Sequence, residues 1–417
     1  MLALRRVCVL LLLLCGSTAE VWAQLATGPF HFLRPTRRRV RLPFQQQRNF
    51  IIVSARINGS GPYNFLLDTG AGTSIITSPH LADSLGLRRG ERFRVIGAGG
   101  QTTSLLAYQL NNVRLTMSGV EAPAMSMLVL SEDVLNLSGY VGMPIHGILG
   151  PEFFYSFVVT VLPQQEMLVL QPPAAFQTPR SPRWASLPLQ IERSKAYVTV
   201  PVHLSDSLQL PLKLVLDTGA GHALSLEAGS HPQLQLPAQQ LPAELGRGLT
   251  GVVRGHLGRV AELQLGRYQL RSVLTSFPDV ADVHGRADVP RNGNLGFELL
   301  KRFAFTIDYS RQRLWLRPNM HFTAPFEHDM SGLDLMAAGP DLHRFLVLRV
   351  APDSPAAAAG IQPDEEVVAV NFVSASTFTL TQISHLLHSL DGRSIILVLR
   401  RPNGELHTAI VRLKRQI

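Results

Sequence analysis

The chain contains little cysteine and no long apolar run beyond its N-terminus. Among 417 residues there are only two cysteines, Cys8 and Cys15. Both lie in a segment typical of a secretory signal, in which two arginines precede a short apolar core that ends in small residues near Ala23. We therefore expect residues 1–23 to be a signal peptide, and the mature chain to contain no thiol and no disulfide.

The lack of disulfides and of a second long apolar run indicates where in the cell the mature protein resides. No later stretch approaches the roughly 18 apolar residues that span a bilayer, so we expect no stable membrane insertion after signal cleavage. An exported chain without disulfides is typical of a bacterial periplasmic or extracellular protein. The alternative is a lipid anchor at Cys15, because residues 12–16 loosely resemble a bacterial lipobox, although Leu14 stands where a small residue is expected.

The net charge of +9 does not by itself indicate an anionic partner, because arginine is spread along the whole chain. One dense arginine run occupies positions 34–41, mostly within a basic N-terminal arm that we place at residues 24–40. No interleaved aromatic residues or recognised nucleic-acid module accompany this run. The sequence favours a solvated arm and predicts no nucleic-acid partner.

The string Asp-Thr-Gly-Ala-Gly occurs twice, at residues 68–72 and 217–221, each time after an apolar run typical of a strand. A single copy is often an ordinary turn started by aspartate. Two copies place Asp68 and Asp217 on equivalent turns, where their carboxyl groups can meet. Like charges about 3 Å apart cannot both ionise, so such a pair shares one proton. One carboxylate can then activate water while the other protonates a carbonyl.

The two strings belong to a longer internal repeat. The aspartates are 149 positions apart, and a shift of 146 pairs Gly150 with Gly296 and Thr160 with Thr306. Alternating apolar residues in each copy indicate strands, with few and short helical segments. We therefore predict one β-lobe at residues 41–174, a second at 175–322, and a separate unit of mixed α/β character at 328–417.

Each copy continues to a glycine-flanked segment, residues 147–150 and 293–296, that leads into a short helix. Asp-Thr-Gly-Ala, a glycine-rich hairpin and Ile-Leu-Gly together resemble the retropepsin-like aspartic proteases. The alanines Ala71 and Ala220 favour that branch over the pepsin-like one. The resemblance implies a mainly β fold, in which two retropepsin-like β-barrel lobes form a pseudo-twofold bilobal aspartic protease.

The resemblance also implies roles for individual residues. Asp68 and Asp217 would be catalytic, and the flap over the substrate would lie at residues 95–101. The residues implied to support the pair are Thr69, Gly70, Thr218 and Gly219, and those implied for the flap are Gly97, Ala98, Gly99 and Gly100. The matching segment 248–255 has bulkier residues, which predicts a stiffer second loop. A nucleotide loop at the flap glycines is disfavoured because no helix follows them.

Residues 328–417 resemble a PDZ domain of the bacterial protease-associated type, through Ser-Pro-Ala at 354–356 and Ala-Gly-Ile-Gln-Pro at 359–363. The family binds extended peptides at a sheet edge and holds their C-terminal carboxylate on backbone amides. The implied carboxylate loop consists of Gly332, Leu333, Asp334 and Leu335. The sequence departs from the family at two places. Asp364-Glu365 stands where Gly-Asp is usual, and Phe372 stands where glycine commonly follows asparagine.

We therefore predict an exported aspartic endopeptidase that cleaves polypeptides and binds peptide C-termini through its PDZ domain. No cofactor is required, and no histidine pair has metal-ligand spacing. His146 and His222, near the two signature segments, are expected to be structural. One alternative is a catalytically inactive peptide-binding scaffold that retains the protease fold. Another is that lobes pair between chains instead of within one.

Overall fold

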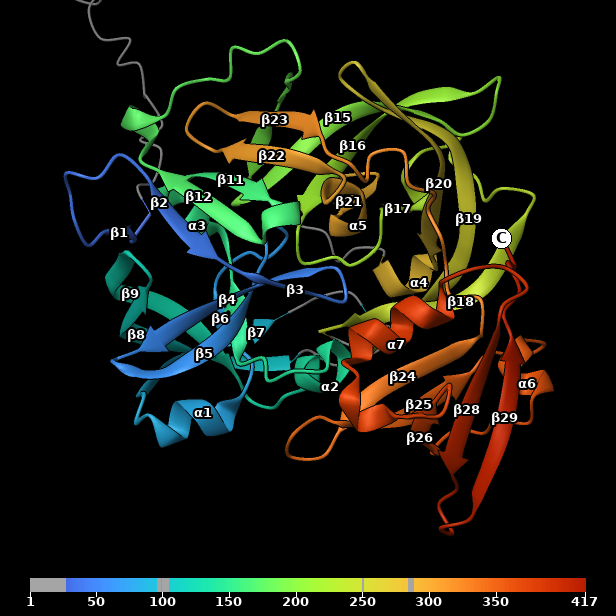
Figure 1. Cartoon of the computed structure of the whole chain (residues 1–417). Coiled ribbons are helices and arrows are strands. Elements are labelled where there is room, and N and C mark those ends of the chain that lie inside the picture. Colours follow the sequence, from blue (N-terminus) through green and yellow to red (C-terminus); the bar gives the residue numbers. More distant parts are fainter. Residues whose placement is uncertain (1–27, 96–98, 100–104, 250, 284–288) are drawn as a thin grey trace, which may run out of the picture.

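The computed structural model describes residues 28–95, 99, 105–249, 251–283 and 289–417. The predicted signal and three flap residues, Gly97, Ala98 and Gly100, lie outside these ranges. The described part is mainly β and contains four sheets (Figure 1). This confirms the predicted mainly β fold with a C-terminal PDZ unit.

Nine strands form the sheet of the first lobe: β1 (His31–Phe32), β3 (Gln45–Gln47), β4 (Phe50–Ile57), β5 (Ser60–Leu67), β6 (Ile75–Ile76), β7 (Arg89–Val95), β8 (Leu105–Met117), β9 (Val120–Leu130) and β10 (Gly147–Leu149). Their order is β1-β9-β6-β10-β5-β4-β8-β7, with β3 beside β4. Asn58 and Gly59 join β4 to β5 in left-handed conformations, with φ of 49° and 87°, as a tight hairpin requires. Part of the predicted N-terminal arm belongs to this lobe, because Phe30 and Phe32 are buried.

Eight strands repeat this arrangement in the second lobe: β14 (Gln190–Glu192), β15 (Lys195–His203), β16 (Gln209–Asp217), β17 (Leu224–Leu226), β18 (Gln240–Gly248), β19 (Gly251–Leu265), β20 (Tyr268–Pro278) and β21 (Gly293–Gly296). Their order is β14-β15-β16-β21-β17-β20-β19-β18. In both lobes the strand before the signature aspartate pairs in parallel with the later glycine-flanked strand.

A six-stranded sheet joins the lobes: β2 (Val40–Pro43), β11 (Val158–Leu162), β12 (Met167–Gln171), β13 (Ala185–Pro188), β22 (Phe303–Asp308) and β23 (Arg313–Pro318). At its centre β11 of one lobe pairs with β22 of the other, and Thr160 faces Thr306. The hydroxyl oxygens of these two threonines are 2.8 Å apart. The same residue from each repeat therefore meets its own copy, which marks the pseudo-twofold axis.

The C-terminal unit has its own sheet: β24 (Leu333–Ala338), β25 (Arg344–Val350), β26 (Glu366–Val370), β27 (Val373–Ser374), β28 (Ser394–Arg400) and β29 (Leu406–Arg412). The helices of the described chain are short: α1 (Pro79–Ser84), α2 (Leu137–Val141), α3 (Pro151–Ser156), α4 (Val280–Val283), α5 (Phe297–Leu300), α6 (Pro355–Ala358), α7 (Leu380–Leu387), η1 (Pro163–Gln165), η2 (Pro173–Ala175), η3 (Ala228–Ser230) and η4 (Ala375–Thr377). The first turn of α7 is closed by a capping box between Thr379 and Gln382. Within the described ranges, no helix has the length and apolar character to cross a membrane.

Two separate apolar cores follow from these sheets. One extends from Phe30 to Phe326 and contains buried residues of both lobes. The other extends from Met330 to Leu413 and belongs to the C-terminal unit. The two lobes therefore pack as one body, and the C-terminal unit has the core of an independent module.

Candidate active site

Paired strands carry the two signature turns to the interface between the lobes. Asp68 follows β5, and its amide donates to the carbonyl of Leu149 in β10 at 2.9 Å. Asp217 ends β16, where it is paired with Gly296 of β21. The glycine-flanked strand therefore supports the turn from behind in both lobes.

Two buried threonines lock the turns together. The hydroxyl of Thr69 donates to the carbonyl of Leu216 at 2.6 Å, and that of Thr218 donates to the carbonyl of Leu67 at 2.8 Å. The hydroxyl of Thr69 also accepts from the backbone amide of Thr218 at 3.0 Å, and the hydroxyl of Thr218 accepts from that of Thr69 at 3.1 Å. Both side chains are almost fully buried, so each of these bonds is shielded from competing water.

The same interlock brings the two carboxyl groups within hydrogen-bonding reach of each other. Each aspartate also accepts from the amide of the glycine two residues later: Gly70 donates to Asp68 at 2.6 Å, and Gly219 donates to Asp217 at 3.1 Å. A Cβ on Gly70 would lie 2.6 Å from Oδ1 of Asp217, and one on Gly219 would overlap the carboxyl of Asp68. Glycine is therefore needed at both positions because the opposite carboxyl group fills the space.

The pair is asymmetric in its charge. Burial, followed by the nearby charge of Asp217, raises the pKa of Asp68 to about 7. The side-chain amide of Asn294 donates to Oδ2 of Asp217 at 2.7 Å. The matching strand position in the first lobe is Ile148, which has no hydrogen-bond donor in its side chain. The arrangement favours a proton on Asp68.

Sequence analysis missed Asn294, although it is the one polar residue within its apolar-apolar-Gly segment. Glu152 was also missed. Its carboxylate accepts from the hydroxyl of Thr73 at 2.8 Å and from that of Ser74 at 2.7 Å. The hydroxyl of Ser74 in turn accepts from the amide of Gly150 at 2.9 Å. Glu152 therefore fixes the chain just beyond the first signature. Its importance could have been predicted from the sequence, because a glutamate also stands at the equivalent position 298 of the second repeat.

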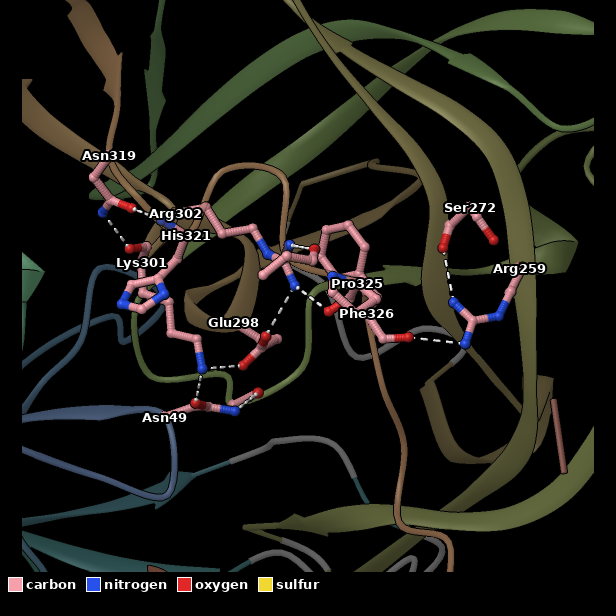
Figure 2. Close-up of polar contacts among 12 residues, drawn as sticks. Asn49, Arg259, Ser272, Glu298, Lys301, Arg302, Asn319, His321, Pro325 and Phe326 are labelled. Carbon is pink, nitrogen blue, oxygen red and sulfur yellow. Dashed lines mark hydrogen bonds and ion pairs between the residues drawn. The ribbon is translucent and has the colours of Figure 1, made fainter. Parts of the chain in front are cut away.

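The second lobe uses the equivalent glutamate differently. Glu298 forms ion pairs with Lys301 and Arg302, and Lys301 also donates to the side-chain oxygen of Asn49 in the first lobe at 2.8 Å. The side-chain amide of Asn49 donates to the carbonyl of Gly221, the last residue of the second signature, at 3.0 Å. Figure 2 shows Lys301 between Glu298 and Asn49. The second signature turn is therefore supported from the turn between β3 and β4.

Two hairpins reach from one lobe to the other. The predicted flap belongs to the hairpin of β7 and β8, in which Val95 pairs with Leu105. Of the four residues predicted for the flap, only Gly99 is described. Its backbone amide donates to the carbonyl of Asp282 in α4 at 3.2 Å. The second hairpin, β18–β19, turns between Gly248 and Gly251. Leu249 near its tip packs on the apolar cluster that borders the first hairpin. The two hairpins therefore contact each other's lobes.

The two histidines have different surroundings. The ring of His146 accepts from the amide of Asn64 at 3.1 Å. Nε2 of His222 is buried without a hydrogen-bond partner, and burial lowers the pKa of this ring despite the charge of Asp217. Among the residues that the structure describes, no group of three or more histidine, cysteine or acidic side chains is arranged to hold a metal ion.

The predicted carboxylate loop of the PDZ unit is already hydrogen-bonded internally. The amide of Gly332 donates to Oδ2 of Asp329, and that of Leu333 donates to the hydroxyl of Ser331 at 3.1 Å. Asp334 forms an ion pair with Arg349, and Leu335 is buried. A peptide carboxylate would therefore have to replace Asp329 at the Gly332 amide.

Two family models match parts of this chain. Residues 53–153 match the family model described as aspartyl protease, and residues 346–401 match that of the PDZ domain. A solved structure of basic 7S globulin from soybean is 10% identical and covers 69% of this chain and 97% of its own, with a TM-score of 0.41. No curated protein matches the chain. The chain thus contains an aspartyl protease domain and a PDZ domain.

Proposed function

We propose that this protein is an exported aspartic endopeptidase whose two lobes form one active site within a single chain. The observation that carries the proposal is the reciprocal bonding of Thr69 and Thr218, which holds Asp68 and Asp217 face to face. A scaffold that only bound peptides would gain nothing from two carboxyl groups that share a proton. The substrates would be polypeptides, and no cofactor enters the chemistry.

In this mechanism Asp217 is the base and Asp68 the acid. Asp217, whose charge is stabilised by Asn294 and Gly219, takes a proton from a water molecule held between the carboxyl groups. The water oxygen attacks the scissile carbonyl while Asp68 donates its proton to the developing oxyanion. On collapse of the tetrahedral intermediate the C–N bond breaks, Asp217 gives its proton to the leaving nitrogen, and a hydroxyl of the intermediate returns a proton to Asp68. No bond between enzyme and substrate is formed at any step.

The proposal is tested with the mature chain, residues 24–417, and a library of unlabelled peptides. Asp68→Asn and Asp217→Asn should each abolish cleavage, since neither variant can share a proton between two carboxyl groups. Asp206→Asn, in the exposed turn between β15 and β16, is the matched control and should cleave normally. Cleavage that survives either active-site change would contradict the mechanism. Peptide binding by a wild type that never cleaves would favour the scaffold alternative.

Two further elements of the proposal need their own measurements. Cell fractionation of a bacterial host expressing the full chain should place the mature protein outside the cytoplasm, with Gln24 at or near its N-terminus. Activity that is proportional to protein concentration down to nanomolar dilution would support pairing of the lobes within one chain. Loss of specific activity on dilution would instead favour pairing between chains.

A further inference from the structure

The edge of the PDZ sheet is covered by a segment of the first protease lobe. Strand β24 pairs only with β25 among the described strands, and α7 lies beside its other edge. We call the strip between β24 and α7 the groove, because the PDZ resemblance implies that an extended peptide would add to this edge. In this structure α2, from the first lobe, lies against β24 (Figure 1). The groove is therefore occupied by the chain itself.

Close packing at this contact depends on two glycines. The side-chain amide of Asn136 lies 3.1 Å from the sulfur of Met336 in β24. A Cβ on Gly139 would lie 3.1 Å from the carbonyl oxygen of Ala337, and one on Gly142 would lie 2.8 Å from Cβ of Leu380. Leu380 is the first residue of α7. The segment 136–142 therefore contacts both walls of the groove. A side chain at Gly142 would press against α7, and one at Gly139 would crowd the capping side chain of Asn136, at 2.8 Å, as well as β24.

The other end of the groove is also filled from within. Asp329 accepts from the amide of Gly332 and from the hydroxyl of Ser331, the latter at 2.7 Å. This internal carboxylate occupies the amide of Gly332, in the loop that the PDZ resemblance implies for a peptide carboxylate. An external ligand would have to displace both Asp329 and α2.

The helix that α2 contacts is also bonded to the support of the catalytic turn. Thr381, next to Leu380, accepts from the amide of Arg48 at 3.2 Å and donates to the side chain of Gln47 at 2.6 Å. The guanidinium of Arg48 donates to Ser384 at 3.0 Å and lies over the ring of Tyr140 in α2. Arg48 therefore touches α7 and α2 at once.

The next residue carries the connection into the active site. Asn49 bonds to Gly221 of the second signature and to Lys301, as Figure 2 shows for Lys301. The matching turn in the second lobe, Arg193-Ser194, has nearly the same left-handed conformation. The conformation of the turn is thus a property of the repeat. The bonds from α7 fix the position of the Arg48-Asn49 turn of the first lobe.

The PDZ unit is also tied to the second lobe at both of its ends. Arg302 donates to the carbonyl of Pro325 at 3.0 Å, and Arg259 donates to the carbonyl of Phe326 at 2.8 Å (Figure 2). Arg259 also donates to the carbonyl of Ile417 at 3.2 Å. These bonds clamp the linker and the C-terminus. A ligand in the groove would therefore shift α2 and α7 locally, while the PDZ unit stays attached.

We propose that the groove between β24 and α7 is an inhibitory site, in which an extended peptide with a free C-terminal carboxylate competes with α2. When α2 is in place, α7 holds the Arg48-Asn49 turn against Gly221 and the catalytic turn is supported. When a peptide displaces α2, that support is lost and cleavage slows. The effect on cleavage rests on the proposed peptidase function, whereas the competition for the groove does not.

The experiment uses the mature chain and a fluorescein-labelled copy of residues 134–141 that ends in a free carboxylate at Val141. Gly139→Val, which crowds Ala337, should bind this probe at least tenfold more tightly than wild type. Asn136→Cys combined with Met336→Cys, joined by a short bismaleimide, should lose probe binding and keep its kcat. Residues 24–417 contain no other thiol that could react. Saturating probe should lower the kcat of wild type at least fivefold on an unrelated peptide substrate.

A third variant tests the bonds between α7 and the Arg48-Asn49 turn separately from peptide binding in the groove. Thr381→Val removes the bonds to Arg48 and Gln47, so it should lower kcat without changing probe affinity, whereas Thr377→Val, in the same unit, should change neither. Equal probe affinity in the cross-linked and free proteins, or no probe binding even to Gly139→Val, would overturn the competition. Probe binding that leaves kcat unchanged would overturn the inhibitory role. A wild type that cleaves nothing would refute the peptidase proposal alone, because the binding measurements would still decide the competition.

Discussion

The side-chain amide of Asn294 donates to Oδ2 of Asp217 at 2.7 Å, and no equivalent bond reaches Asp68 within the described residues. Ile148 occupies the matching strand position in the first lobe. The pseudo-twofold symmetry of the site is therefore broken by one amide group. The two aspartates are therefore chemically unequal, and the raised pKa of Asp68 places the proton of the pair on that side.

Replacing Asn294 by isoleucine would restore the symmetry of the pair. Without the amide, the charged form of Asp217 is less stable, so the acidic limb of the profile of kcat/KM against pH should move to higher pH. We expect kcat at the optimum to fall about tenfold, which corresponds to about 1.4 kcal/mol. Ile148→Val, a change of similar size without a polar group, is the control and should leave the limb in place. An unmoved limb in Asn294→Ile would contradict the assignment.

The raised pKa of Asp68 has a consequence for stability. Between the unfolded value of about 3.9 and the folded value of about 7, the native state binds more protons than the unfolded state. The contribution of Asp68 to the free energy of unfolding is therefore present below pH 4 and declines as the pH rises to 7. Urea titrations from pH 4 to pH 7 should show Asp68→Asn gaining stability relative to wild type. A constant difference across this range would contradict the raised pKa.

Thr69 should be sensitive to loss of its hydroxyl. In Thr69→Val the carbonyl of Leu216 and the amide of Thr218 lose their buried partner, and each unsatisfied group costs about 1–3 kcal/mol. Unfolding midpoints in urea should fall accordingly, and kcat should fall with them because the carboxyl groups are no longer held together. Thr69→Ser keeps the oxygen and should recover most of both. If serine were as damaging as valine, the hydroxyl bonds would not be what holds the two turns together.

The repeat in the sequence predicted the symmetric features well. The shift of 146 that aligns Thr160 with Thr306 also makes them strand partners across the lobe interface, because a residue on a twofold axis meets its own copy. The parallel pairing behind each signature turn repeats for the same reason. Sequence periodicity identifies strands and their buried faces, and duplication then identifies how the two lobes join.

The features that break the symmetry were not predictable in this way. Asn294 and Ile148 differ at one position of an otherwise matched segment, and no periodic pattern says which carboxyl the amide will reach. The contact of Gly139 with β24 joins residues about 200 positions apart in the chain. Glycine in a loop has many ordinary explanations, so only the packed structure shows that these glycines fit a groove. The bond from Asn49 to Gly221 depends on the docking of two lobes and has no local signal.

Glu152 offers a final test, because it stabilises the first signature turn without touching the aspartates. Its carboxylate accepts from Thr73 and from the amide and hydroxyl of Ser74. In Glu152→Gln one acceptor becomes a donor that faces the hydroxyl of Ser74, so at least one bond to the turn is lost. We expect the free energy of unfolding to fall by about 1–3 kcal/mol and kcat to fall while KM changes little. Glu91→Gln, on exposed β7, should change neither, and an unaltered kcat in Glu152→Gln would show that the turn holds its position without this carboxylate.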